Sequence, residues 1–214
     1  MYTYDAADNR KTKTGAGMGS ASSVLTNGVA DDELLTYNGF NQLVCIEAGT
    51  DTITYSYYPS RLRATKGANS AVTKFILDGG NVAMEAVNGA ATAKYIRSIN
   101  LLYSITGGAT DWYIYNAHGD VVQLTDASGA VTKEYAYDAF GVEKDPDAND
   151  MNPFRYCGEY FDLSSGLYYL RARYYNPATG RFLTEDTYWN PGNMVYGDAR
   201  CNHACVHLLQ LQSA

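Results

Sequence analysis

The sequence lacks a run of apolar residues long enough to cross a membrane. No window reaches the roughly 18 residues that a spanning helix needs, and residues 99–105 are the best short candidate. The first residues, MYTYDAADNRKTKT, also lack the basic stretch and apolar core of an export signal. We therefore expect no transmembrane segment and no signal peptide within this chain.

Positive charge is also scarce. Charged residues make up 18% of the chain, and 23 Asp and Glu outnumber 16 Lys and Arg, which gives a net charge of -7 and a pI near 4.9. Binding of phosphate depends on clustered Lys and Arg, and the arginines at 171, 173 and 181 do not overturn the acidic balance. We therefore expect no nucleic-acid partner.

Cysteines are few and far apart. Cys45, Cys157, Cys201 and Cys205 neither form a framework of close spacings nor reach the density of a disulfide scaffold. The sequence leaves their redox state open.

Tyrosine and glycine are abundant, with 20 of each against 6 Phe and 2 Trp. Aromatic residues suit the pleated surface of a strand, and Gly allows the positive φ of tight turns. The 214 residues fit one domain or a large fragment of one. We therefore predict an all-β fold.

The tyrosines recur in a repeat, which is seen by aligning YTYDAADNR, LTYNGFNQL, YSYYPSRLR, FILDGGNVA, YIYNAHGDV and YAYDAFGVE. Each copy reads apolar, any residue, apolar, polar, and then a turn. The second apolar positions, continued through FRYCGE and RYYNPATG, are Tyr4, Tyr37, Tyr57, Leu77, Tyr115, Tyr137, Tyr156 and Tyr175. These positions are 33, 20, 20, 38, 22, 19 and 19 residues apart, which indicates a period of about 20. The step of 38 holds one degenerate unit around KYIRSIN, and the step of 33 holds one unit's worth plus the insertion GAGMGSASSVLTNG.

A unit of this length has room for two short strands and two turns. Residues i and i+2 lie on the same face of a strand, so Tyr55 with Tyr57, or Tyr113 with Tyr115, forms a two-residue apolar rung. Stacked units join the rungs into a wall that one hairpin cannot bury alone. We predict a coiling antiparallel sheet of hairpins whose tyrosine face is turned toward a cavity.

The repeats, and above all NPFRYCGEYFDLSSGLYYLRARYYNPATGRFLTED, closely resemble the Rhs or YD-repeat family and its Rhs-associated core segment over residues 2–198. The resemblance implies a spiral β-sheet shell that encloses a variable C-terminal polypeptide, often a toxin. It also implies a parent protein that a bacterium secretes or carries on its surface. The C-terminal effector itself is expected to be absent from this chain.

The resemblance suggests boundaries along the chain. We expect a partial repeat in residues 1–14, a Gly- and Ser-rich insertion in 15–30, and repeats in 31–150. The core segment is expected in residues 151–198, followed by a divergent, disordered tail in 199–214.

The candidate functional residues are predicted to stabilise the fold. They are Arg155, Tyr156, Gly158, Glu159, Gly166, Tyr168, Tyr169, Arg171, Arg173, Tyr174, Tyr175, Pro177, Gly180, Arg181 and Phe182 of the core segment, with the repeat tyrosines Tyr4, Tyr37, Tyr57, Tyr115 and Tyr137. Arg171 and Arg173 are predicted to share one strand face and to pair with Glu159, Asp162 or Glu185. Buried pairs of this kind would lock the fold and hold a plug, without catalysis.

Some members of the family cut their own chain with aspartates in a downstream motif D-P-x-G-L. This sequence contains no D-P-x-G, and its nearest string, DPDA at residues 145–148, lies upstream and lacks the Gly. No G-x-S-x-G elbow supplies a nucleophile for His118, which we place in a turn. We therefore predict no catalytic residue and no enzymatic activity.

Two stretches resemble metal sites only in part. The four Cys and His residues at 201–207 would lie along one strand face over roughly 20 Å, which cannot close a zinc tetrahedron. DPDANDMNPFRY has Asp150 and Tyr156 where a calcium loop needs Gly and Glu. We predict no metal and no cofactor.

Three functions remain open from the sequence. The preferred one is a structural shell that encloses or presents a C-terminal effector. The alternatives are a surface module that binds glycans through exposed aromatic residues, and a self-cleaving protease that cuts near residues 186–198. Open strand edges also predict that the chain self-associates when it is expressed alone.

Overall fold

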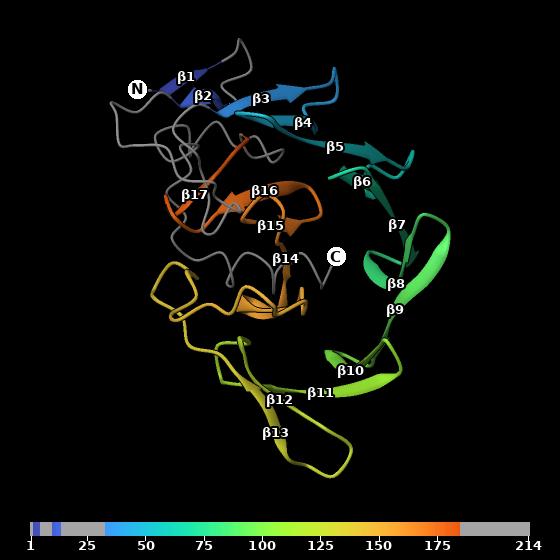
Figure 1. Cartoon of the computed structure of the whole chain (residues 1–214). Helices are drawn as coiled ribbons and strands as arrows, with labels where there is room; N and C mark the ends of the chain where they lie inside the picture. Colours follow the sequence, from blue (N-terminus) through green and yellow to red (C-terminus); the bar gives the residue numbers. More distant parts are fainter. Residues whose placement is uncertain (1, 5–9, 14–32, 185–214) are drawn as a thin grey trace.

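The computed structural model describes residues 2–4, 10–13 and 33–184 of the chain (Figure 1). These residues form 17 β-strands and one short 3-10 helix, η1 (Tyr156–Gly158), which confirms the all-β prediction. None of their helices is long and apolar enough to cross a membrane. The predicted insertion at 15–30 and the tail at 199–214, with its Cys and His residues, lie outside the described residues.

Thirteen strands form one antiparallel sheet in which each strand pairs with its neighbours in the chain. They are β1 (Tyr2–Tyr4), β2 (Arg10–Lys13), β3 (Glu33–Tyr37), β4 (Leu43–Ala48), β5 (Asp51–Tyr57), β6 (Arg63–Ala68), β7 (Ala71–Asp78), β8 (Asn81–Val87), β9 (Ala90–Arg97), β10 (Leu101–Thr106), β11 (Ala109–Tyr115), β12 (Val121–Thr125) and β13 (Val131–Glu134). The sheet bends into an arc from β1 round to β13 (Figure 1). Strands β5, β7, β9 and β11 begin at residues 51, 71, 90 and 109, in steps of 20, 19 and 19, which confirms a unit of two strands and two turns.

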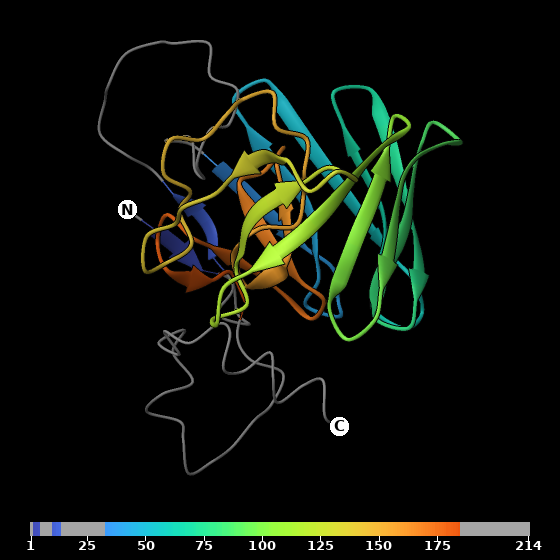
Figure 2. The same ribbon diagram turned by 90° about the horizontal axis from the view of Figure 1, so that it is seen from below.

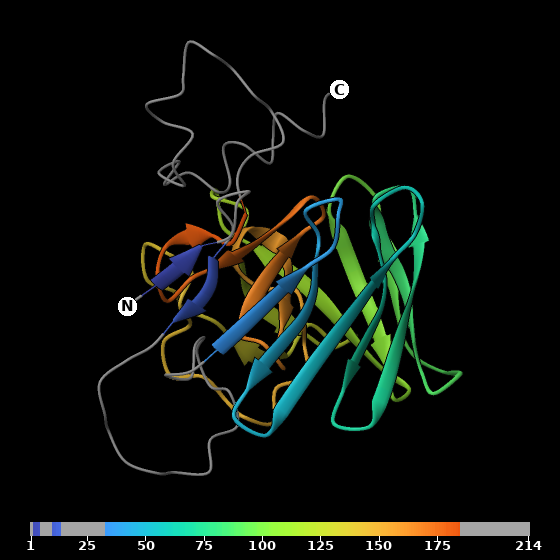
Figure 3. The ribbon, with the colours of Figure 1, turned by 90° about the horizontal axis from the view of Figure 1, so that it is seen from above.

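A β-bulge recurs just before the second apolar position of the repeat. The strand register shifts immediately before Tyr4, Tyr37, Tyr57, Leu77 and Tyr115. A bulge places two residues opposite one, bends the strand and increases its twist. The repeat therefore bends the sheet at the same point of successive units, and the sheet curves into the arc of Figure 1, whose strands are seen side by side in Figure 3.

The tyrosine at the second apolar position of a unit can form a hydrogen bond to the preceding unit. Three of these tyrosines donate a hydroxyl hydrogen bond to a backbone oxygen at the start of a strand 14 to 16 residues upstream: Tyr57 to Leu43 at 2.5 Å, Tyr115 to Leu101 at 2.9 Å, and Tyr137 to Val121 at 3.0 Å. Burial raises the pKa of Tyr115 to about 12, so this hydroxyl keeps its proton at neutral pH. A tyrosine at this position thus adds a specific bond that phenylalanine could not make.

The Asn or Asp that follows Tyr37, Tyr115 and Tyr137 closes the turn after each of these tyrosines. Its side-chain oxygen accepts two backbone N–H groups, from the residues two and four positions later. Asn38 accepts from Phe40 and Gln42, Asn116 from His118 and Asp120, and Asp138 from Phe140 and Val142, at 2.8–3.1 Å. Tyr115-Asn116 and Tyr137-Asp138 therefore combine a hydrogen bond between units with the closure of a turn.

A second sheet, formed by the core segment, lies inside the arc (Figures 1 and 2). Its four antiparallel strands are β14 (Tyr160–Asp162), β15 (Leu167–Leu170), β16 (Arg173–Asn176) and β17 (Arg181–Phe182). The spacing of Tyr156 and Tyr175 predicted that they continue the repeat sheet. This prediction is wrong, because the chain leaves that sheet after β13. The expected cavity is also wrong here: every residue of β14 and β15 is buried, and both strands share one apolar cluster with the repeat sheet.

We predict that Tyr115→Phe lowers the free energy of unfolding by about 1 kcal/mol, because the buried backbone oxygen of Leu101 loses its hydroxyl donor. Urea denaturation measures the change. Tyr103→Phe is the matched control, because the Tyr103 ring stacks on Trp112 and its hydroxyl has no hydrogen-bond partner among the described residues. Equal losses in the two variants would show that the tie between units does not contribute.

Candidate functional site: the contact between the repeat sheet and the core segment

Asp162, the last residue of β14, is fully buried at this contact. Its carboxylate accepts hydrogen bonds from Arg63 Nη1 at 3.0 Å and Lys66 Nζ at 2.7 Å, both on β6, and from the Tyr55 hydroxyl at 3.1 Å. Burial alone raises the pKa of the Asp162 carboxyl, but Lys66 and Arg63 outweigh burial and hold that pKa below its usual value. A charged and compensated carboxylate thus joins the core segment to the repeat sheet.

Aromatic rings surround the guanidinium group of Arg63, which is 1% exposed. The ring centroids of Phe75, Tyr169, Tyr160 and Tyr55 lie 4.3, 4.4, 4.8 and 5.8 Å from its Cζ. Two of these rings belong to the repeat sheet and two to the core segment. A cation over ring faces is attracted by their quadrupoles, most strongly away from water. The rings therefore help to stabilise a group whose Nε and Nη2 make no hydrogen bond.

Sequence reasoning missed Arg63, although the repeat contained a signal. Arg63 opens β6 and pairs with Tyr57. Leu43, Val82 and Val121 hold the corresponding position in other units and are buried. A charged residue at a position that is otherwise apolar indicates a buried ionic partner elsewhere in the chain.

A second buried arginine, Arg155, holds the start of the core segment to the loop after β13. It forms ion pairs with Glu143 and, at 3.3 Å, with Asp150. Its Nε donates to the backbone oxygen of Asn152 at 3.0 Å, and its Cζ lies 5.0 Å from the Phe161 ring centroid. Burial raises the pKa of Glu143, and Arg155 opposes that shift. The sequence singled out Arg155 but not its partners.

Arg171 and Arg173 do not share a strand face, and this prediction is wrong. Arg171, with a φ of 58°, and Ala172 form the two-residue turn between β15 and β16. Arg173 lies beyond the turn, with its Cζ 3.8 Å from the Phe182 ring centroid. The sequence LRARYY reads as one strand because neither Gly nor Asn marks the turn.

The pairing of Arg171 with Glu159 agrees with the prediction, at 3.2 Å. Arg171 also reaches the β7–β8 turn, where it donates to the Gly80 backbone oxygen at 3.2 Å and to Asn81 Oδ1 at 3.0 Å. Of the other two predicted partners, Asp162 is bound by β6 instead, and Glu185 lies outside the described residues. Arg171 thus attaches the β15–β16 hairpin to the repeat sheet.

Three core tyrosines bind one turn of the last repeat unit, at residues 139–141. Each donates its hydroxyl to a backbone oxygen there: Tyr156 to Ala139 at 3.2 Å, Tyr175 to Phe140 at 2.9 Å, and Tyr168 to Gly141 at 3.2 Å. These bonds require the core segment to approach the turn closely.

Two glycines permit that approach. A Cβ on Gly141 would lie 2.6 Å from the Tyr156 ring, and a Cβ on Gly180 would lie 2.9 Å from the Phe140 ring. Both glycines have positive φ, of 87° and 64°. Any side chain at either position would separate the turn from the core segment.

The remaining candidate residues lie around these contacts. The Tyr169 hydroxyl accepts the Arg63 backbone N–H at 2.7 Å, and the Tyr174 ring lies 5.2 Å from that of Tyr55. Tyr37 donates to the Leu183 backbone oxygen at 3.4 Å. Gly158, Gly166 and Pro177 lie in turns or in η1, and Arg181 is exposed. Tyr4 is described only in its backbone.

His118 lies in the turn between β11 and β12, as predicted. Its Nδ1 is 2.9 Å from Asp120 Oδ1, which also accepts the Cys157 backbone N–H at 2.9 Å. Side-chain atoms of these three residues lie within 4.8 Å of one another, but Cys157 is disulfide-bonded and has no thiolate to offer a metal. Both oxygens of the Asp120 carboxylate are already bonded. Oδ1 joins the turn to η1 through the Cys157 N–H, and Oδ2 accepts a hydrogen bond from Asn116 Nδ2 at 2.8 Å.

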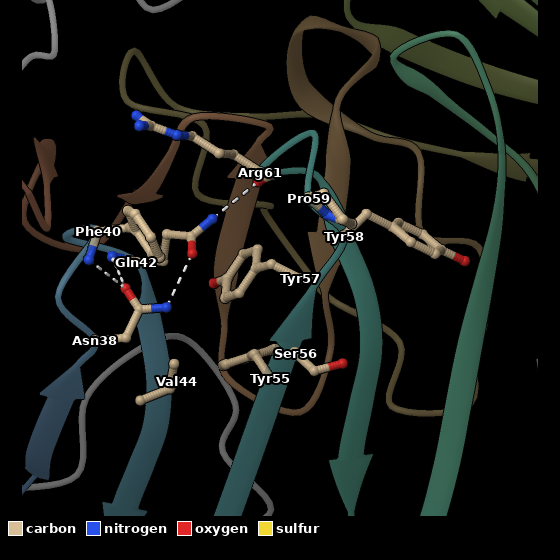
Figure 4. A pocket seen from close by; sticks show the side chains of 10 residues that line it. All are labelled: Asn38, Phe40, Gln42, Val44, Tyr55, Ser56, Tyr57, Tyr58, Pro59 and Arg61. Atoms are coloured by element: carbon tan, nitrogen blue, oxygen red, sulfur yellow. Dashed lines mark hydrogen bonds between the residues drawn. The ribbon is translucent and has the colours of Figure 1, made fainter.

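An open pocket of about 610 Å³ lies between the β3–β4 and β5–β6 turns (Figure 4). Phe40, 69% exposed, stands at this pocket with the Arg61 guanidinium 5.6 Å from its ring centroid. Gln42 Nε2 donates to the Arg61 backbone oxygen at 3.2 Å, and Asn38 Nδ2 donates to Gln42 Oε1 at 2.9 Å. Because these side-chain amides are hydrogen-bonded within the turns, the surface that a ligand would contact in the pocket is mainly aromatic.

This chain is similar to known proteins over most of its length. The family model described as Teneurin YD-shell matches residues 88–199. The tRNA3(Ser)-specific nuclease WapA of Bacillus spizizenii is 35% identical over 226 residues, which cover 90% of this chain and 10% of WapA. Toxin protein Tse5 of Pseudomonas aeruginosa is 39% identical over 71 residues, or 32% of this chain and 5% of Tse5.

A solved structure shows the same fold at lower identity. The crystal structure of TcdB2-TccC3 without its hypervariable C-terminal region aligns with a TM-score of 0.62 and 18% identity, over 96% of this chain and 13% of that one. The chain therefore spans only a small part of the length of the proteins that it matches.

We predict that Asp162→Asn lowers the free energy of unfolding by about 3 kcal/mol or more, because Arg63 and Lys66 then remain without a counter-charge beside a buried site. Urea denaturation measures the loss. Asp147→Asn is the matched control: Asp147 pairs with Lys133 at 3.3 Å with its side chain 49% exposed, so its loss should stay below about 1 kcal/mol.

The pH dependence of that difference tests its ionic origin. A carboxyl whose pKa is lowered by folding adds stability above its unfolded pKa of roughly 3.9, and this stability is lost as the pH falls through the folded pKa. The gap between the wild-type chain and Asp162→Asn should therefore be full at neutral pH and shrink in acid. A gap that does not change with pH would mean that packing, not charge, holds Asp162 in place.

Proposed function

The chain belongs to the YD-shell family of Rhs-type repeat proteins, and we propose from this that it is part of a protein shell that encloses or presents a C-terminal effector of the toxin type. One observation carries the proposal. The core segment enters the concave side of the repeat sheet at β14, and Leu183 and Thr184 are still 3% and 8% exposed. The described part of the core segment therefore ends in a buried position, which supports enclosure of an effector that follows the shell.

The similar proteins support a toxin-type effector. WapA is named as a tRNA nuclease and Tse5 as a toxin, and the chain matches only part of each. We therefore propose that the parent protein is secreted by a bacterium or displayed on its surface, and that the effector is its partner. Self-association of this chain through its edge strands β1 and β13 stays a prediction.

We propose that the chain itself has no enzymatic activity. The buried ionisable groups Asp162, Glu143 and Glu159 each pair with an arginine that holds two parts of the fold together. The self-cleaving alternative concerns residues 186–198, which lie outside the described residues. The division into repeats at 31–150 and a core segment at 151–198 is part of the same proposal.

In the full-length parent protein, limited proteolysis should leave the polypeptide after the shell uncut while the shell is intact. Asp162→Asn should expose it and speed its cleavage, because the core segment loses its ionic attachment to the repeat sheet. Mass spectrometry of the fragments over time measures both rates, with Asp147→Asn as the control. Rapid cleavage of that polypeptide in the intact wild-type protein would refute enclosure.

The glycan-binding alternative is favoured by the pocket at Phe40. An exposed ring with free surface beside it is the kind of platform on which a sugar stacks, and Tyr57 and Tyr58 line the same pocket (Figure 4). If this function holds, the chain binds on a glycan array and Phe40→Ala abolishes binding. Met151→Ala, which removes another exposed apolar side chain, should retain it. Absence of binding by the wild-type chain would exclude this function.

A further inference from the structure

Arg97, which is half-buried, differs from the other arginines of the contact. Arg63, Arg155 and Arg171 each pair with a carboxylate. Arg97, the last residue of β9, makes no ion pair or hydrogen bond with a described residue, and its buried Nε has no hydrogen-bond partner. The Arg97 guanidinium group lies over the Phe154 ring, whose centroid is 4.8 Å from the Arg97 Cζ. A guanidinium group that offers five donors is left with none of them used.

The electrostatic surroundings do not compensate the Arg97 charge. Burial lowers the pKa of Arg97, and the nearby charge of Arg171 acts in the same direction, although Tyr115 raises this pKa. Glu159 opposes these effects, but its carboxylate is already bonded through both oxygens to Arg171. Two arginines thus share one carboxylate, which leaves one positive charge without a counter-charge in a partly buried position.

Arg97 lines a pocket of about 260 Å³ at the turn-bearing end of β8–β12. Arg171, Glu159, the amides of Asn81 and Asn100, and the turn that carries His118 also line it. The Asn81 oxygen is used by Arg171, so the Asn81 amide has its N–H groups left to offer. This space holds a small ion or one side chain, and it is too small for a folded segment.

We propose that this pocket binds a small oxyanion, a carboxylate or a phosphate group, with Arg97 as the main ligand and Arg171 beside it. A planar guanidinium fork matches two oxygens of such a group, and charge-assisted bonds of this kind are the strong ones. The oxyanion can be a free ion or an acidic side chain of another polypeptide. The site does not depend on the proposed enclosure of an effector.

The test is an NMR titration of the 15N-labelled chain, which follows the arginine Nε–Hε signals. The probes are inorganic phosphate, acetate and N-acetyl-glutamate amide, each compared with sodium chloride at the same ionic strength. Arg97→Met should weaken probe binding about tenfold or more. Arg61→Met is the control, because it removes the same charge from an arginine that stacks on Phe40 in the other pocket.

The outcomes separate the two sources of the oxyanion. Arg97-dependent binding of phosphate alone identifies a free phosphate, and binding of acetate and the glutamate amide identifies a carboxylate that a polypeptide can supply. If Arg97→Met does not fold, Arg97→Lys replaces it, since it keeps the charge but loses the fork and should also weaken binding. Shifts that match those in chloride, or that persist equally in the Arg97 variants, overturn the proposal.

Discussion

The fold depends on one constraint: a strip of hairpins that curves in one direction has a concave apolar face that its own strands cannot cover. Phe75 on β7 shows how the constraint is met, because its ring lies edge-on to Tyr160 of the core segment at 5.6 Å and is fully buried. Exposing such a side chain to water would cost about 1.5–3 kcal/mol. The repeats and the core segment therefore form one cooperative structure, in which each supplies the other's missing apolar partner.

Apolar packing makes the core segment adhere, and the ion pairs determine where it lies. Asp162 has its counter-charges on β6, and Arg171 has part of its hydrogen bonding at the β7–β8 turn. A core segment displaced by one strand would bury these groups without partners, and an unpaired buried charge is far costlier than a poor apolar contact. The charges thus select one register among several that would bury similar apolar area.

The sequence predicted what repeats and could not predict what occurs once. The period of the tyrosines and the Asn or Asp that follows most of them are local signals, and they predicted the strands, the turns and the antiparallel order. The change of sheet after β13 has no such signal, because Tyr156 and Tyr175 keep the same spacing in a different sheet. Arg171 was misread because its turn lacks turn residues, and Arg63 was overlooked although it interrupts an apolar position. The Arg171 error is thus local, whereas the partner of Arg63, Asp162, lies 99 positions along the chain, at a separation that no local pattern records.

The hydroxyl bond from one unit to the strand before it has a consequence for how such chains change length. Since Tyr115 and Tyr57 each reach back only one unit, a whole unit can be duplicated or deleted without changing the partners of those on either side. Insertion of part of a unit would move the next tyrosine away from its carbonyl and its side chain off the concave face. Recombination between two copies that keep this tyrosine would therefore lengthen or shorten the chain by whole units and leave the hydroxyl bonds of the neighbouring units in place.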